Sequence, residues 1–230
     1  MPRSKVGRLK SNSFGTILEI TEEIDKETVI VFDKTHGVLL GECDYRSFLR
    51  GNIISPLDRQ FNNLGFLGVG KYNEKDNKKE FKFFQQFIDR KLYVYNDELL
   101  DFQKFCDWYQ DNYYEIDRID NYGYKMMMKI NAINEKLVFL PSDIDRLIEA
   151  TKDMDKYVVC RSFSSYDEYK IFIPKINNTK SKVDTLYKYD EKEIEKIFIS
   201  ELQKYIRSLD DEFLVDMPTD VKELIRNIEL

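Results

Sequence analysis

The stretch TVIVFDKTHGVLLGEC, residues 28–43, predicts a β-hairpin near the start of the chain. Its two apolar runs, 28–32 and 37–43, are rich in the β-branched and aliphatic residues typical of strands. The polar residues between them form the turn. His36, the single histidine of the chain, lies there, and most mechanisms that need a histidine base have only this candidate. A turn residue is nevertheless the stronger interpretation, because polar residues tolerate unusual backbone angles.

A short basic arm precedes this hairpin. It contains Arg3, Lys5, Arg8 and Lys10, and no acidic residue follows until Glu19. A frayed, solvated terminus is the competing interpretation, since loose basic ends are common. The arm is therefore a candidate for contacts with phosphate only together with other cations nearby.

The segment that follows the hairpin, residues 45–72, is rich in Gly, Asn and Pro, which predicts mostly loop and turn. It ends in GFLGVGKY (65–72), one residue away from the phosphate-binding pattern G-x-x-x-x-G-K-[ST]. Such a loop needs a preceding strand, a following helix, and a hydroxyl that holds magnesium. Turn-rich sequence precedes this one, a charged run (73–80) follows it, and Tyr72 replaces Ser or Thr. We therefore expect no nucleotide to bind here.

The charged run NEKDNKKE, residues 73–80, is interpreted as a linker that ends the first module. Residues 81–93 favour a helix, and Asp97 or Asp101 can cap a second one. Its apolar stripe is typical of a core rather than of a base-stacking platform and comprises Phe102, Phe105, Cys106, Tyr109 and Tyr113. Residues 124–148 then predict two short strands joined by a polar turn, with Ser142 capping a further helical turn.

The C-terminal part predicts a sheet and a helix. Runs at 157–163 and 169–173 form a hairpin, and a third strand lies at 183–189. A helix capped by Asp190, with Glu193 completing a capping box, packs on this sheet. A short helix follows Pro218. The fold class is therefore α+β, with a β-rich N-terminal module (1–72), a helical centre (73–150) and a C-terminal sheet packed on a helix (151–230).

Composition restricts the function classes. The 230 residues carry a formal charge of −6. Residues 1–72 hold ten bases and nine acids; 36 minus 10 leaves 26 bases and 42 minus 9 leaves 33 acids, so the rest has a net charge of −7. Residues 1–72 are thus the part of the chain that repels a polyanion least. Three scattered cysteines indicate neither a disulfide framework nor a zinc site, which fits a reducing cytoplasm. No segment suits a membrane span.

Several motifs occur in an order that resembles a known family. YRSFLRGNIISPLDRQFNNLGFLGVGKYN (45–73) is similar to a segment of phage and prophage proteins of the HNH homing-endonuclease type, in which a module ending G-x-(I/V)-x-(N/S)-P precedes GvGylGxGKY. ELLDFQKFCDWYQDNYYEI (98–116) resembles the family's WLNFQNFAEWFDENYYE, and LVFLPSDIDRLI (137–148) its CvFVPxxIN-x-L. The C-terminal part resembles an appended APETALA-type DNA-binding module. The resemblance implies a bacterial host cell.

The chain departs from this family where the nuclease should be. Active relatives carry a His, acids and Asn there, whereas this chain has the shorter YGYKMMMKINAINEK (122–136). Lys125 and Lys129 stand among three methionines, and Glu135 is the only acid. Asn131 and Asn134 are relics of the family's Asn or, as more commonly found, turn residues. Without a His or an acid pair nothing here activates water or holds a metal. We therefore expect no catalytic residue, metal ligand or cofactor.

Three functions compete. The first is a catalytically inactive phage-type DNA-binding protein; its candidate phosphate contacts are Arg3, Lys5, Arg8, Lys10, Arg46, Arg50 and Lys71. The second is a mobile-element inhibitor that binds a nucleic-acid-processing host protein, such as a defence nuclease, since an acidic body can occupy a basic channel. The third, a working nuclease with acids from elsewhere in the chain, ranks last.

Overall fold

A computed structural model describes residues 4–117, 123–142, 144–145, 148–149, 159–161, 168–174, 181–187, 214 and 216–228. The chain groups into two compact units. The first unit comprises Met1–Asp89 and Asp97–Trp108, and the second comprises Arg90–Asn96 and Tyr109–Leu230. Sheets and helices occur in both, so the α+β class is confirmed. The division into modules at residues 72 and 150 stays a prediction.

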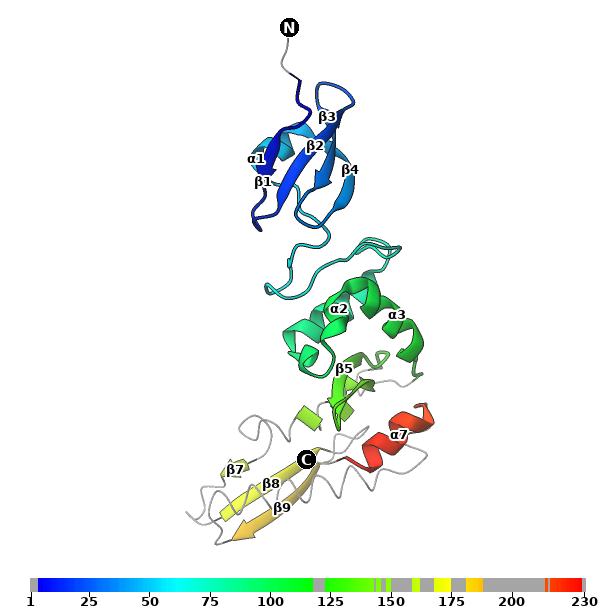
Figure 1. Cartoon of the computed structure of the whole chain (residues 1–230). Coiled ribbons are helices and arrows are strands. Elements are labelled where there is room, and N and C mark those ends of the chain that lie inside the picture. The colour runs from blue at the N-terminus through cyan, green and yellow to red at the C-terminus, as the bar shows by residue number, and fades with distance from the viewer. Residues whose placement is uncertain are drawn as a thin grey trace. The chain divides into compact units, whose positions relative to one another are not determined.

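The first unit opens with a four-stranded antiparallel sheet of order β1-β2-β3-β4, drawn in dark to mid blue in Figure 1. Its strands are β1 (Leu9–Ser11), β2 (Ile17–Glu23), β3 (Thr28–Asp33) and β4 (Val38–Asp44). The hairpin predicted from residues 28–43 is β3 and β4, which pair in register from Thr28 opposite Asp44. Alternate side chains of β2 and β3 point inward and form the core with Phe48.

A short helix, α1 (Tyr45–Arg50), follows β4 directly, where the sequence predicted mostly loop. The side chain of Asp44 accepts a hydrogen bond from the Ser47 N–H and caps the N-terminus. Gly51 ends the helix with a left-handed backbone, φ 72°. A β-carbon there would lie 2.9 Å from the Ser11 carbonyl oxygen, so glycine lets α1 end against β1. Asp44 and Gly51 are both residues that commonly cap helices. The Gly and Asn content of residues 45–72 nevertheless favoured the prediction of loop and turn.

Two helices and a 3₁₀ turn complete the first unit: α2 (Lys78–Asp89), η2 (Asp97–Leu100) and α3 (Phe102–Asn112), which runs on into the second unit. The charged run is not a linker throughout, because α2 begins at Lys78 and an Asn73 turn leads into it. Asp101 caps α3, as one of the two predicted caps. Four residues of the predicted stripe are core, since Phe102, Phe105 and Cys106 are completely buried and Tyr109 is 6% exposed, whereas Tyr113 follows the end of α3 and is only partly buried.

In the second unit, η1 (Leu92–Val94) precedes the predicted hairpin of β5 (Met128–Ile133) and β6 (Lys136–Pro141). Asn134 and Glu135 form its turn with positive φ angles, and the described residues after Pro141, which are 142, 144–145 and 148–149, are helical. Three further strands form the predicted C-terminal sheet of order β7-β8-β9: β7 (Val159–Arg161), β8 (Glu168–Pro174) and β9 (Ser181–Tyr187).

The terminal helix α7 (Thr219–Arg226), red in Figure 1, starts after Pro218 as predicted and buries Val221 and Ile225. The helix predicted to begin at Asp190 lies outside the described residues, as does Arg3 of the basic arm. Among the described helices, none has the length and apolar character that a membrane span requires.

Candidate nucleic-acid interface

Lys5, one of the predicted phosphate contacts, is a structural clamp. Its ammonium lies 3.0 Å from Glu23 Oε1 and donates to the carbonyls of Asp25 and Lys26 at 2.9 and 2.8 Å. It also sits 4.5 Å above the centroid of the Tyr45 ring, and its side chain is only 12% exposed. The hydrogen bond from Lys5 lowers the pKa of Glu23. Lys5 therefore ties the N-terminal segment to the β2–β3 turn.

Three other candidate phosphate contacts form a hydrogen bond or an ion pair with another side chain at the surface. Arg8 Nη1 donates to the Tyr45 hydroxyl at 2.5 Å. Arg46 Nη2 lies 3.7 Å from Glu27 Oε1, and Lys71 Nζ lies 3.5 Å from Asp107 Oδ1. Both ion pairs are solvent-exposed, and exposed pairs contribute only about 0–1 kcal/mol. A phosphate can therefore compete for Arg46 and Lys71.

Lys10 and Arg50 are the candidates that remain without an acidic partner within 4 Å among the residues described here, and both are exposed. Both belong to segments that adjoin at Gly51, where β1 runs beside the end of α1 (Figure 1). The Lys10 Cε lies 3.6 Å from the place that a β-carbon on Gly51 would take, and Arg50 directly precedes Gly51. The Lys10 side chain thus lies against the C-terminal end of α1, whose last residue is Arg50, 40 positions later in sequence.

A buried carboxylate holds this surface together. Asp58 accepts hydrogen bonds from Asn12 Nδ2 at 2.6 Å, from the Ser55 N–H at 2.7 Å, and from the Thr16 hydroxyl. Asn12 Nδ2 also donates to the Ile53 carbonyl at 3.1 Å. These bonds fix the β1–β2 turn against the segment after α1. The sequence analysis missed this cluster, and its only signal is a polar side chain at each of four positions that look like ordinary loop.

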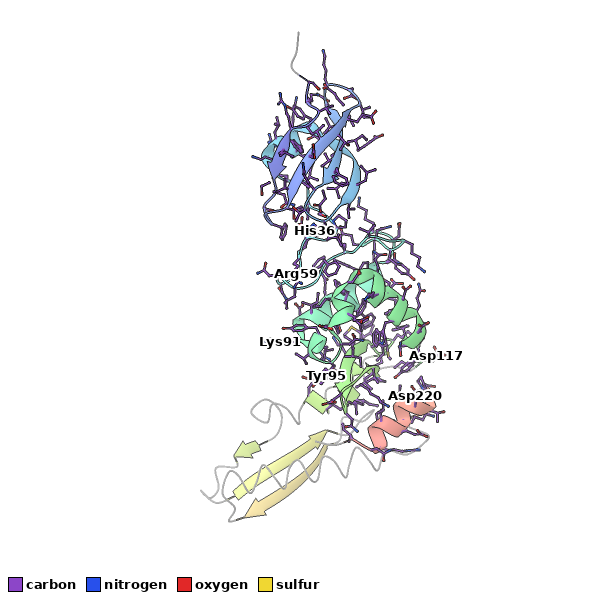
Figure 2. The ribbon with its side chains drawn as sticks, viewed as in Figure 1. His36, Arg59, Lys91, Tyr95, Asp117 and Asp220 are labelled. Carbon is purple, nitrogen blue, oxygen red and sulfur yellow. The ribbon has the colours of Figure 1, made fainter. Side chains whose placement is uncertain are left out.

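His36, labelled in Figure 2, is a turn residue as expected. Its Nδ1 lies 2.7 Å from Asp33 Oδ2, and its N–H donates to Asp33 Oδ1 at 3.0 Å. Burial would raise the pKa of Asp33, but hydrogen bonds from Ser55 and His36 outweigh it, so the pKa is lowered. The charged carboxylate therefore fixes the turn between β3 and β4.

The glycine loop at residues 65–72 is built around Gln103 of α3. The Gln103 amide donates to the carbonyls of Leu67 and Tyr72 at 2.9 Å and accepts from the Tyr72 N–H at 2.9 Å. A β-carbon on Gly70 would lie 2.3 Å from Gln103 Oε1, so glycine permits this approach. Turns precede the loop and α2 starts only at Lys78, as the sequence argument required.

Residues 128–135 form β5 and the turn after it. Asn134 is in the turn as expected, but Asn131 is not: it lies in β5, almost fully buried. Asn131 Nδ2 donates to Asp145 Oδ1 at 2.8 Å and to Glu149 Oε1 at 3.0 Å. The turn interpretation of Asn131 was wrong because its partners lie 14 and 18 residues away.

A guanidinium completes this cluster. Arg90 donates two parallel hydrogen bonds to Asp145 at 2.6 and 2.7 Å and a third to the Ile130 carbonyl at 2.7 Å. The hydrogen bond to Asp145 raises the pKa of Arg90 despite burial. Lys125 lies 3.4 Å from Glu115. Within the described part of the chain, no three His, Cys, Asp or Glu side chains group as metal ligands. The cluster can hold β5 to the helix after β6.

Comparisons with protein-family models, with curated proteins and with solved structures found no match to this chain. The resemblance to HNH-type homing endonucleases therefore stays a hypothesis that rests on the order of its motifs.

Proposed function

We propose that this chain is a catalytically inactive, phage-type nucleic-acid-binding protein derived from a homing-endonuclease scaffold. The observation that carries the proposal is the pair Lys10 and Arg50 beside Gly51, two exposed cations without an acid within 4 Å in the described residues. Arg8 and Arg46 lie on the same small module. Such cations neutralise phosphates and position a nucleic acid without reading its sequence.

The charge distribution limits the affinity. The acidic remainder of the chain repels a polyanion, so binding rests on a few phosphate contacts at the N-terminal module. Each neutralised phosphate releases counterions, which makes binding weaken as salt rises. We expect modest affinity with a shallow salt dependence.

The central cluster supports the absence of catalysis. Arg90 donates to both oxygens of Asp145, so this carboxylate is already paired with a cation, and no group of three possible metal ligands is found among the described residues. Burial raises the pKa of the Cys106 thiol to about 12, so this thiol is not a nucleophile at neutral pH. The mechanism proposed for this protein is therefore binding alone.

Fluorescence anisotropy with a labelled oligonucleotide tests the proposal. We expect the Lys10→Ala/Arg50→Ala double variant to weaken binding and to reduce the slope of log affinity against log salt by about 2, one for each phosphate contact. The matched control is Lys34→Ala, since Lys34 is exposed but pairs with Glu19 at 3.1 Å. Equal binding by the two variants argues against this surface. Cleavage of DNA with magnesium, manganese or zinc overturns the absence of catalysis.

An inhibitor that binds a nucleic-acid-processing host protein is the second candidate. Exposed aliphatic residues on the N-terminal sheet favour it: Leu9, Ile17 and Leu39 are 56%, 45% and 63% exposed. Apolar side chains of this kind suit a protein interface. Under this alternative the same titration gives no affinity for nucleic acid at any salt, and a stoichiometric complex forms with a host protein.

A further inference from the structure

An exposed aromatic ring projects from the β1–β2 turn. Phe14 is 42% exposed and makes no ring contact with another aromatic side chain within the described ranges. Its backbone is nevertheless fixed, because the Phe14 N–H donates to Asn12 Oδ1 at 2.9 Å and Asn12 is locked to Asp58. Phe14 does not belong to the core cluster of β2, β3 and Phe48, and part of its ring is open to solvent.

The turn that carries Phe14 is joined to the cationic surface. The Asn12 Cα lies 3.6 Å from the place that a β-carbon on Gly51 would take, and the Lys10 Cε lies at the same distance from it. Asn12 thus touches the end of α1, whose last residue is Arg50, and also holds the backbone of Phe14 two positions later. The buried polar cluster holds the aromatic residue and both cations on neighbouring segments of one module.

We propose that Lys10, Phe14 and Arg50 form a site for single-stranded nucleic acid, with a base stacked on Phe14 and phosphates on the two cations. This inference rests on the proposed function and narrows its substrate class. The bases of a duplex are stacked on one another, whereas those of a single strand are free to stack on a protein ring. Every base has a flat π-face, so the site is tolerant of sequence.

The charge of the site favours this occupant over an apolar peptide. Both side chains beside the turn are cationic, and neither has an acid within 4 Å among the described residues. Cations next to an aromatic ring are the combination that tracks a strand's phosphates while its bases stack. A protein partner remains an outcome of the test.

Anisotropy with single-stranded and duplex oligonucleotides of equal length, at one salt concentration, tests the site. We expect the protein to bind the single strand more tightly than the duplex. Phe14→Leu keeps an apolar side chain but removes the ring, so single-strand affinity falls about fivefold to a hundredfold while the salt slope stays unchanged. Phe14→Trp keeps the affinity, and the fluorescence of the new tryptophan is quenched when a base stacks on it. Val94→Ala, an exposed apolar change in η1, is the matched control.

The outcomes separate the two proposals. Binding that prefers duplex, or is insensitive to Phe14→Leu but weakened by Lys10→Ala/Arg50→Ala, overturns the single-strand site and leaves the proposed function standing. No affinity for either nucleic acid overturns both. Circular dichroism of each variant checks the fold. Substitution of an exposed side chain should leave the spectrum unchanged.

Discussion

Two buried carboxylates in the two units are satisfied in opposite ways. Asp58 in the first unit accepts hydrogen bonds only from neutral groups: an amide, a hydroxyl and a backbone N–H. Asp145 in the second unit is held by the Arg90 guanidinium as well as by Asn131. Both residues are almost completely inaccessible to water. The difference shows that similar burial can be stabilised by dipoles or by an opposite charge, with different consequences when a partner is lost.

The largest effect is expected at Arg90. Arg90→Met removes the charge that compensates Asp145 and leaves a buried anion, which destabilises the fold by about 3–5 kcal/mol. Urea unfolding followed by circular dichroism measures it. The double variant Arg90→Met/Asp145→Leu should recover much of the loss, because no unpaired charge remains. A single variant as stable as the parent would show that the pair contributes nothing.

A smaller effect is expected at Asp58. Asp58→Ala removes the acceptor of the Thr16 hydroxyl and of one of the two Asn12 amide N–H bonds, at a cost of about 1–3 kcal/mol. The same urea measurement applies, and the neighbouring exposed Arg59, labelled in Figure 2, provides the control Arg59→Ala. If Asp58→Ala lowered the free energy of unfolding more than Arg90→Met does, the expectation that loss of a charged partner is more destabilising than loss of neutral partners would be wrong.

Asp33 and Asp101 extend the comparison to pH. Hydrogen bonds lower the pKa of Asp33, so its stabilising contribution is present above about pH 4 and is lost as pH falls through its folded pKa. Burial raises the pKa of Asp101, so its stabilising contribution exists at acid pH and is lost as pH rises through its folded pKa.

Asp101→Asn should therefore raise the melting temperature slightly at pH 7, since Asn also caps a helix and carries no charge to desolvate. Asp33→Asn should lower it. Thermal unfolding at pH 4 and pH 7 distinguishes the two, and the gain from Asp101→Asn should shrink at the lower pH. Equal shifts at both pH values would mean that ionisation is not the cause.

The smallest effect on stability is expected at the proposed interface. Lys10→Ala/Arg50→Ala removes exposed charges that have no acid within 4 Å among the described residues, so the free energy of unfolding should change by less than about 0.5 kcal/mol. The same variant should nevertheless weaken nucleic-acid binding. A large loss of stability instead would assign these cations to the fold, as Lys5 is.

Local pattern was sufficient for the elements whose partners are near in sequence. The hairpin at residues 28–43, the buried stripe of α3 and the hairpin with its Asn134 turn were all predicted from periodicity and turn residues. The start of α2 and the whole of α1 were missed, although Asp44 and Gly51 are good caps. A six-residue helix has too short an apolar pattern to outweigh the Gly and Asn around it.

The candidate site also has a part that local sequence predicted and a part that depends on contacts between distant residues. Sequence alone identified Lys10 and Arg50 as cations on the less acidic part of the chain, because charge is a local property. It did not determine that Lys10 lies against the end of α1, that Lys5 is a clamp, or that the turn carrying Phe14 is tied to the same part of the fold. Those facts depend on Asn12 reaching Asp58 across 46 positions and on β1 packing against the end of α1. Hydrogen bonds between distant residues leave no periodic trace, so only the tertiary structure decided which cations are free to bind.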